Sequence, residues 1–385
     1  MKKVLATILA LVMALGLTTY AWADTGVDCA GGEACTHAAE FNGKHYNHLV
    51  DAYAALTRGT TKPTTAQVIT LLKDSSGGGI GSDADTNMNY VIDFGGHTYT
   101  VGAPAVGSTG TVSQGLRVLQ TSTAKFMNGT LKADNYNGLA QVVHTYGDVT
   151  FENFNVDARE NSYAQIAVEP DCGTLIITGN SSILAREGMT GLYVAFWHTG
   201  TYNGTTVNVN TTGKITGKLV YEFDEDMTGD AAATENRAVL NIANGNFEIT
   251  CIQTLFSGVA NEALKEAKIE VSGGTFSTDV KEYLAEGKIL QKNGDTYTAV
   301  TNSAITSGTY TSEPTVPSGY KATKNDDGTW TVSKVSYYYY QPTTDTKTTD
   351  TKGSPKTFDA GIALYVGMAL TSAAGVAFVG KKRED

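Results

Sequence analysis

Short apolar runs rich in β-branched and aromatic residues recur through residues 90–276, and the stretches between them lack the period of a helix. Six of these runs share a phrase, an apolar stretch that ends in Gly or Asn. They begin at Phe126, Phe151, Ile176, Val207, Leu240 and Ile269, which are separated by 25, 25, 31, 33 and 29 positions. An unequal repeat of this length is typical of a solenoid whose coils each contribute several short strands.

The residues that end the runs support this interpretation. Gly and Asn adopt left-handed backbone angles at low cost, so they suit the tight corners of a coil. We therefore expect Asn128, Asn153 and Asn180 at equivalent corners of successive coils. The sequence predicts an all-β protein with a right-handed parallel β-helix over residues 76–276. A pair of β-sandwiches is the alternative, but it would need Asn-Gly or Asp-Gly hairpin turns, which are sparse before residue 290.

Smaller units flank the predicted β-helix. Residues 24–75 are expected to form a helix–strand cap, because Leu49, Val50, Tyr53 and Leu56 fit one face of a short helix that Asn47 would cap. Residues 277–340 hold two copies of a small module offset by 33 to 34 positions. Each copy is expected to end in a hairpin, with its turn at Asn293-Gly294 or Asp327-Gly328.

The two ends of the sequence predict export and attachment. Residues 1–23 have two early lysines, an apolar stretch and a small-residue site, the pattern of a secretory signal peptide. Residues 360–379 form a 20-residue apolar run that is long enough to cross a bilayer, and a basic tail follows it. Residues 341–353 are rich in Thr and contain too few apolar side chains to fold, so we interpret them as a spacer.

A short motif precedes the apolar run. The order of Ser354, Pro355, Lys356, Thr357 and Phe358, an apolar span and a basic tail resembles the cell-wall sorting signal of Gram-positive surface proteins. In that family sortase, a membrane cysteine transpeptidase, cleaves after Thr. The resemblance implies that Thr357 becomes amide-linked to peptidoglycan, although the common motifs carry Gly where this chain has Phe358. The alternative is a plain transmembrane anchor.

A wider resemblance covers most of residues 36–276. The segments 45–49, 68–74, 91–99, 106–111 and 128–131 are similar to those of wall-anchored, pectate-lyase-like β-helix surface proteins of gut Firmicutes. This resemblance implies a fold and a location at the cell surface. It implies little about chemistry, because proteins of this kind mostly have no assigned activity.

The cysteines and clustered acids suggest two other kinds of site. Cys29 and Cys35 are close enough for a loop-closing disulfide, with free thiols as the alternative. His37, His45 and His48 follow, but they share no helical face with the cysteines, so no metal site is predicted. The order Asp83, Asp85, Asn87 is similar to a calcium loop but lacks its later Gly and Glu, which favours an ordinary solvated loop.

Polysaccharide lyases and glycosidases are common among β-helices, and their chemistry needs paired carboxylates or a basic group on one face of a coil. Asp157 and Arg159, with Glu152 nearby, are the best local set, and a solvated ion pair is the simpler interpretation. His144 and His198 would be neighbours across coils with Glu169 or Asp171 between them, yet histidines on strands are usually only packed or solvent-facing. The sequence contains no nucleophile elbow, phosphate-binding loop or zinc-protease helix, and no cofactor is expected.

The charge of the chain narrows the choice of partners. Twenty-eight Lys and Arg against 39 Asp and Glu give a net charge of −11, which argues against nucleic acid. We therefore predict a wall-displayed, non-catalytic adhesin whose partners are sortase, peptidoglycan and an extracellular glycan or other cell-surface ligand. Tyr193 and Trp197 share one side of a predicted strand and are the expected ligand-binding aromatics, while Phe196 points inward. A carbohydrate-active enzyme is the alternative function.

Overall fold

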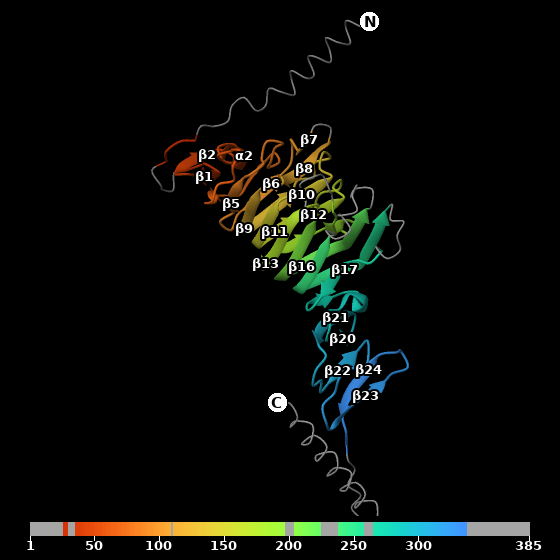
Figure 1. The fold of residues 1–385 in the computed structure, drawn as a ribbon. Helices are drawn as coiled ribbons and strands as arrows, with labels where there is room; N and C mark the ends of the chain where they lie inside the picture. The colour runs from red at the N-terminus through yellow and green to blue at the C-terminus, as the bar shows by residue number, and fades with distance from the viewer. Residues whose placement is uncertain are drawn as a thin grey trace, which may run out of the picture. The chain divides into compact units, whose positions relative to one another are not determined.

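The protein is an all-β chain whose strands coil into a parallel β-solenoid of about six turns (Figure 1). The computed structural model describes residues 26–29, 35–108, 111–196, 204–224, 238–257 and 265–336. Within these ranges the helical elements are α2 (Leu49–Ala54) and a single 3-10 turn at Lys281–Tyr283. The predicted fold class is confirmed.

Each coil contributes strands to three faces, and each face pairs in parallel from coil to coil. The first face contains β3 (Gln67–Leu71), β5 (Asn89–Asp93), β13 (Gly173–Gly179), β18 (Ile269–Val271) and the first parts of the long strands β9 (Thr123–Ala133), β11 (Asp148–Asp157), β16 (Thr205–Asp224) and β17 (Val239–Ser257). The second face contains β4 (Ser75–Gly77), β6 (Thr98–Val101), β14 (Ser182–Leu184), β19 (Thr275–Phe276) and the next parts of the long strands. The third face contains β8 (Thr111–Val118), β10 (Gln141–Thr145), β12 (Ile166–Pro170), β15 (Thr190–Val194) and the ends of β16 and β17.

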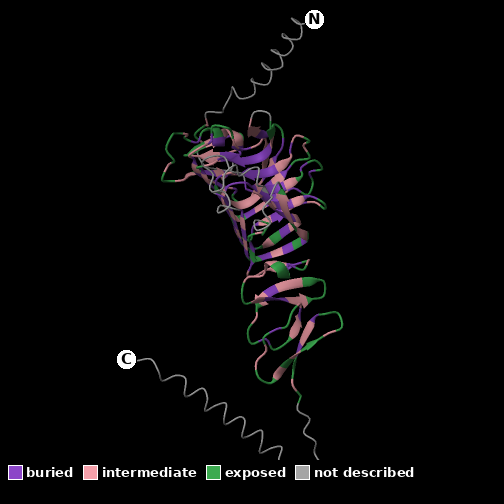
Figure 2. Cartoon of the chain, turned by 45° about the vertical axis from the view of Figure 1, so that its right-hand side comes forward, coloured by how far each residue is buried: buried purple, intermediate pink, exposed green. Residues whose placement is uncertain are grey.

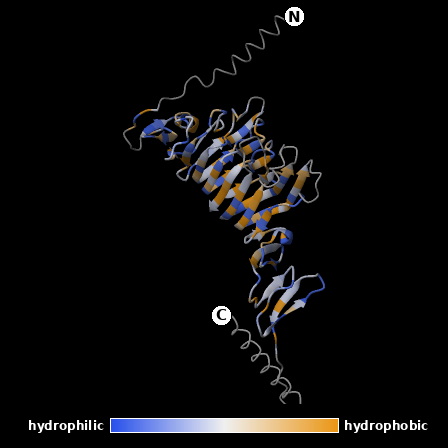
Figure 3. Cartoon of the chain, in the orientation of Figure 1, coloured by the Kyte–Doolittle hydropathy of each residue, from blue (hydrophilic) through white to orange (hydrophobic). Residues whose placement is uncertain are grey.

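Buried, apolar residues alternate with less buried, polar ones along these strands (Figures 2 and 3), so one face of each strand is turned to the interior of the solenoid. On the first face one inward ladder runs in register from β3 to β18. It consists of Ile69, Ile92, Phe126, Phe151, Ile177, Val209, Ile242 and Val271, all at most 1% exposed. A ring contact at 6.2 Å joins Phe126 to Phe151, and Phe154 packs on Phe151 at 5.2 Å. Stacking of coils therefore buries one continuous apolar core, because a lone coil would leave its inner face in water.

The corner between the first and second faces agrees in part with the prediction. Asn128 and Asn153 have φ of 56° and 52° and lie in the same register, as expected. In the next coil Gly179, with φ of 68°, takes this place instead of Asn180. The backbone N–H of Asn180 donates to Asn153 Oδ1 over 3.2 Å, so Asn180 supports the corner from one residue further on. The prediction for Asn180 was therefore wrong by one position, because Gly accepts the left-handed angle more easily than Asn.

The N-terminal end of the solenoid is closed by antiparallel strands. β1 (Ala39–Phe41) pairs with both β2 (Lys44–Tyr46) and β3, so β1 covers the open edge of the first coil. α2 packs beside them and begins after His48, rather than after Asn47 as predicted. Parallel pairing already starts at β3, inside the segment expected to be only a cap.

The loop between β4 and β5 is tied to this end by a buried carboxylate. Asp85 is 2% exposed and accepts hydrogen bonds from Tyr53 Oη at 2.8 Å, Arg58 Nε at 2.7 Å and the Ser82 N–H at 2.6 Å. Asp83 in turn accepts from Arg117 at 2.5 Å. Asp85 is therefore a buried anchor, whereas residues 82–84 are exposed, as predicted for a solvated loop. Both carboxylates accept hydrogen bonds from protein donors.

The two predicted C-terminal modules are present. β20 (Lys288–Asn293) and β21 (Thr296–Thr301) form one hairpin, and β23 (Tyr320–Lys324) and β24 (Trp330–Lys334) form the second. β19 pairs with β21 and β22 (Gly308–Tyr310) pairs with β24, which gives each copy the same three-stranded plan. Because β21 is antiparallel to β19, the first module covers the last coil's open edge.

Four predictions about the two ends of the chain fall outside the described residues. These are the signal peptide at 1–23, the spacer at 341–353, the motif at 354–358 and the apolar span at 360–379. Within the part of the chain that the structure does describe, we find no helix with the length and apolar character needed to span a bilayer.

Candidate functional site on the third face

Outward-pointing polar side chains line up across the third face. Pairing of β8, β10 and β12 places Arg117, His144 and Glu169 in one register. Val168 pairs with Leu192, so the next residue of β15, Tyr193, continues the row. Glu222 lies on the following coil, in β16. The neighbours Leu116, Val143, Val168 and Leu192 are fully buried, and strand alternation therefore turns the polar row away from the core.

His144 is held by hydrogen bonds on both ring nitrogens. Gln114 Nε2 lies 2.8 Å from His144 Nδ1, and His144 Nε2 lies 2.6 Å from Asp171 Oδ2. With the Gln114 amide donating to Nδ1, Nε2 carries the proton and donates to the Asp171 carboxylate. All three residues are about 5% exposed, so this chain is shielded from water and keeps its orientation.

Arg117 closes one end of the row. Its guanidinium donates to Asp83 at 2.5 Å and to Ser108 Oγ at 2.7 Å, and it lies 5.9 Å from the centre of the Tyr146 ring. Arg117 is only 7% exposed. Its charge is therefore used within the protein, and the accessible part of the row is acidic.

The carboxyl group of Glu169 has a raised pKa. Burial, followed by repulsion from Asp171, raises the pKa of Glu169 to about 7. Its Oε2 atom is buried without a hydrogen-bond partner. A carboxyl group that is partly protonated near neutral pH can donate as well as accept a hydrogen bond. Glu169 therefore has a carboxyl oxygen that can still form a hydrogen bond with a ligand.

Tyr193 lies between Glu169 and the next carboxylate, Glu222. Its hydroxyl donates to Glu222 Oε2, and Ser257 Oγ donates to Glu222 Oε1 at 3.0 Å. Burial and the bond to Glu222 raise the pKa of Tyr193, so the phenol stays protonated. Tyr193 is partly exposed. The result is an aromatic ring flanked by two carboxyl groups on adjacent coils.

Three residues in or beside this row carry atoms that can bind a metal ion. Ligand atoms of His144, Glu169 and Asp171 lie within 4.8 Å of one another. Both His144 nitrogens already have protein partners, however, and an ion would have to displace Asp171 from Nε2. The arrangement is better suited to hydrogen bonding with a polar organic ligand.

The structure describes only some of the site residues that the sequence predicts. Tyr193 lies on the polar row and Phe196, 3% exposed, points into the core as expected, whereas Trp197 and His198 lie outside the described residues. His144, Glu169 and Asp171 were expected to be neighbours but not to form a site, and the structure brings them together. Gln114 and Glu222 were not predicted as site residues. They reach the row by hydrogen bonds to His144 and Tyr193 from neighbouring coils, and the local sequence does not encode which residues of two coils meet.

The other candidates have structural partners. Arg159 forms a two-bond ion pair with Asp157 at 2.9 and 2.7 Å, and Glu152 pairs with Lys125 at 2.8 Å. The predicted Cys29–Cys35 disulfide is not formed, since both residues are free cysteines in the structure.

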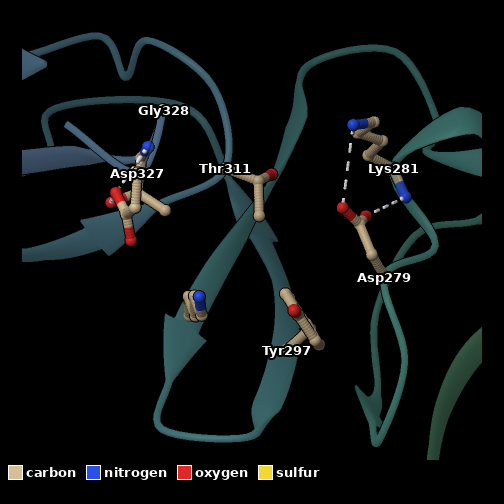
Figure 4. A pocket seen from close by; sticks show the side chains of 8 residues that line it. Asp279, Lys281, Tyr297, Thr311, Asp327 and Gly328 are labelled. Carbon is tan, nitrogen blue, oxygen red and sulfur yellow. Dashed lines mark hydrogen bonds and ion pairs between the residues drawn. The ribbon is translucent and has the colours of Figure 1, made fainter. Parts of the chain in front are cut away.

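A shallow hollow also lies between the C-terminal modules (Figure 4). It is lined in part by Asp279, Lys281, Tyr297, Thr311 and Asp327. Lys281 contacts Asp279, and Asp327 accepts hydrogen bonds from Thr329. Three of the four charged groups that line the hollow therefore have protein partners, which makes it a weaker candidate than the third face.

We compared the chain with known protein families, curated proteins and solved structures. No family model matches the chain, and neither a curated protein nor a solved structure does so.

Proposed function

We propose that this chain is a non-catalytic surface protein that is exported, linked to a Gram-positive wall by sortase, and binds an extracellular glycan through its third face. The observation that carries the binding proposal is the partly exposed Tyr193 ring between Glu169 and Glu222. A ring face with hydrogen-bonding groups on both sides suits a sugar, because sugars combine apolar C–H faces with hydroxyls.

The charge of the face selects the kind of glycan. Arg117 is paired with Asp83, and the two groups on either side of Tyr193 are the carboxyls of Glu169 and Glu222. The chain as a whole carries −11. Because like charges repel, a polyuronate would bind poorly. Neutral mucin-type glycans are therefore the better candidates.

Replacing Tyr193 by Ala should weaken binding of a neutral mucin glycan to the full-length chain about three- to tenfold, since aromatic packing contributes about 0.5–1.5 kcal/mol. Isothermal titration calorimetry measures this change. Tyr163→Ala is the matched control, because Tyr163 is 52% exposed elsewhere on the solenoid and should leave affinity unchanged. Equal affinities of the Tyr193→Ala variant and the wild type would argue against this face as the site.

One observation favours a second function, a carbohydrate-active enzyme. The raised pKa of Glu169 suits a general acid, and Glu222 would be the second carboxylate. The same purified protein and glycans decide between the two. New reducing ends that disappear in Glu169→Gln would establish hydrolysis, whereas binding without products supports the adhesin.

The anchor is tested separately. If Thr357 is joined to peptidoglycan, hot detergent will leave the protein on the wall and muramidase will release it, because an amide bond resists detergent. Western blotting of both fractions measures the distribution. Recovery of intact chain that retains residues 358–385 in the detergent extract would instead establish a membrane anchor.

A further inference from the structure

Four side chains with metal-binding atoms converge at the N-terminal end of the solenoid. The sulfurs of Cys29 and Cys35 and one ring nitrogen each from His37 and His45 all lie within 4.8 Å of one another. They come from three places in the chain: the segment before β1, its junction with β1, and β2. The cluster is distinct from the polar row on the third face, and the inference below does not depend on the proposed function.

Backbone hydrogen bonds bring these ligands together. Val27 N donates to His45 O at 3.0 Å, and His45 N donates to Val27 O at 2.9 Å. Ala38 N donates to Tyr46 O at 2.8 Å, which holds His37 beside the end of the β1–β2 hairpin. Cys29 is two residues from Val27, and Cys35 is two residues from His37. The strands therefore arrange the ligands independently of any ion.

The contacts fit a tetrahedral centre. His37 Nδ1 lies 3.3 Å from Cys29 Sγ and 3.4 Å from Cys35 Sγ, and His45 Nδ1 lies 2.8 Å from Cys35 Sγ. A zinc ion bound at about 2.3 Å to sulfur and about 2.1 Å to nitrogen separates its ligand atoms by about 3.5 Å. The present distances need only small movements to reach that geometry.

The chemistry of the four donors is selective. Two thiolates and two imidazoles suit zinc far better than calcium or magnesium, which prefer oxygen. Four protein ligands leave no open position for water or substrate, so such a centre is structural.

We propose that Cys29, Cys35, His37 and His45 bind one zinc ion, which ties the N-terminal segment to the β1–β2 hairpin and closes this end of the solenoid. The four residues share no helical face, so their spacing in the sequence does not predict a metal site. The ligands are instead brought together by an antiparallel bridge between Val27 and His45.

Zinc content of the full-length chain tests the proposal. After purification under reducing conditions and equilibration with Zn²⁺, the wild type should retain about one zinc per chain on desalting, measured by mass spectrometry of the metal. Co²⁺ in its place should give the visible absorption of a tetrahedral ion and a thiolate-to-metal charge-transfer band. Cys35→Ser and His37→Asn should lower zinc affinity at least about tenfold, because even losing a supporting group costs that much.

Matched variants keep the test independent of folding. Cys251→Ser and His48→Asn remove the same groups outside the cluster and should leave zinc binding unchanged. Circular dichroism should show the same β content in all variants, because the solenoid core does not contain these side chains. Failure of the reduced wild type to retain zinc would overturn the proposal. So would a Cys29–Cys35 disulfide in protein isolated directly from the producing cells.

Discussion

Replacing Ile177 by Ala will lower the free energy of unfolding by about 2–5 kcal/mol. Ile177 is fully buried in the inward ladder of the first face, between Phe151 and Val209. Removing its side chain leaves a cavity between two coils whose backbones are fixed by pairing on both sides, so the site cannot collapse. Urea denaturation followed by circular dichroism measures the change.

The neighbouring residue supplies the control. Ile176 has the same side chain on the same strand but is 39% exposed, and Ile176→Ala should change the free energy of unfolding by less than about 0.5 kcal/mol. If both variants lost the same stability, the assigned inward and outward alternation of β13 would be wrong.

The second large effect concerns pH. The pKa of Glu169 is about 7 in the folded protein, against a reference value of 4.5. Between these values the folded state holds more protons than the unfolded state, so the free energy of unfolding contributed by Glu169 falls as pH rises from 4.5 to 7. The fall amounts to at most about 3 kcal/mol, and the contribution is constant above and below that window.

Glu169→Gln removes the titrating group and should therefore gain stability relative to wild type as the pH is raised from 4.5 to 7. Urea denaturation of both proteins at a series of pH values gives the difference. Glu160→Gln, at a side chain that is 71% exposed, is the control for the loss of one carboxylate from the chain. A difference between Glu169→Gln and wild type that stays constant with pH would contradict a buried, protonated Glu169.

The fold was largely predictable because its signals are local. Runs such as 149–156 alternate on either side of a corner, and Asn128 and Asn153 mark such corners by the conformational preference of a single residue. The dipeptide Asn293-Gly294 likewise predicted a hairpin turn in the first module, and the strands on either side of it form that hairpin. Such features need no knowledge of distant contacts.

Register was harder to predict. The repeat aligned Phe151 with Ile176, whereas Phe151 pairs with Ile177 and Ile176 points outward. Two adjacent isoleucines carry the same local preference, and only the neighbouring coil decides which one is buried. The polar row likewise depends on which residues of neighbouring coils meet. The sequence alone therefore does not single out Glu222, and it does not show that Gln114 and Asp171 hold His144.

The connections between coils have a consequence for how such a chain can change in evolution. Two residues separate β10 from β11, and two separate β12 from β13, whereas ten separate β15 from β16. All three connections leave the third face and enter the first, yet the strands on either side stay in register. Insertions at this edge are therefore tolerated without disturbing the core, and because the edge borders the polar row, new loops there can alter recognition while the scaffold stays the same.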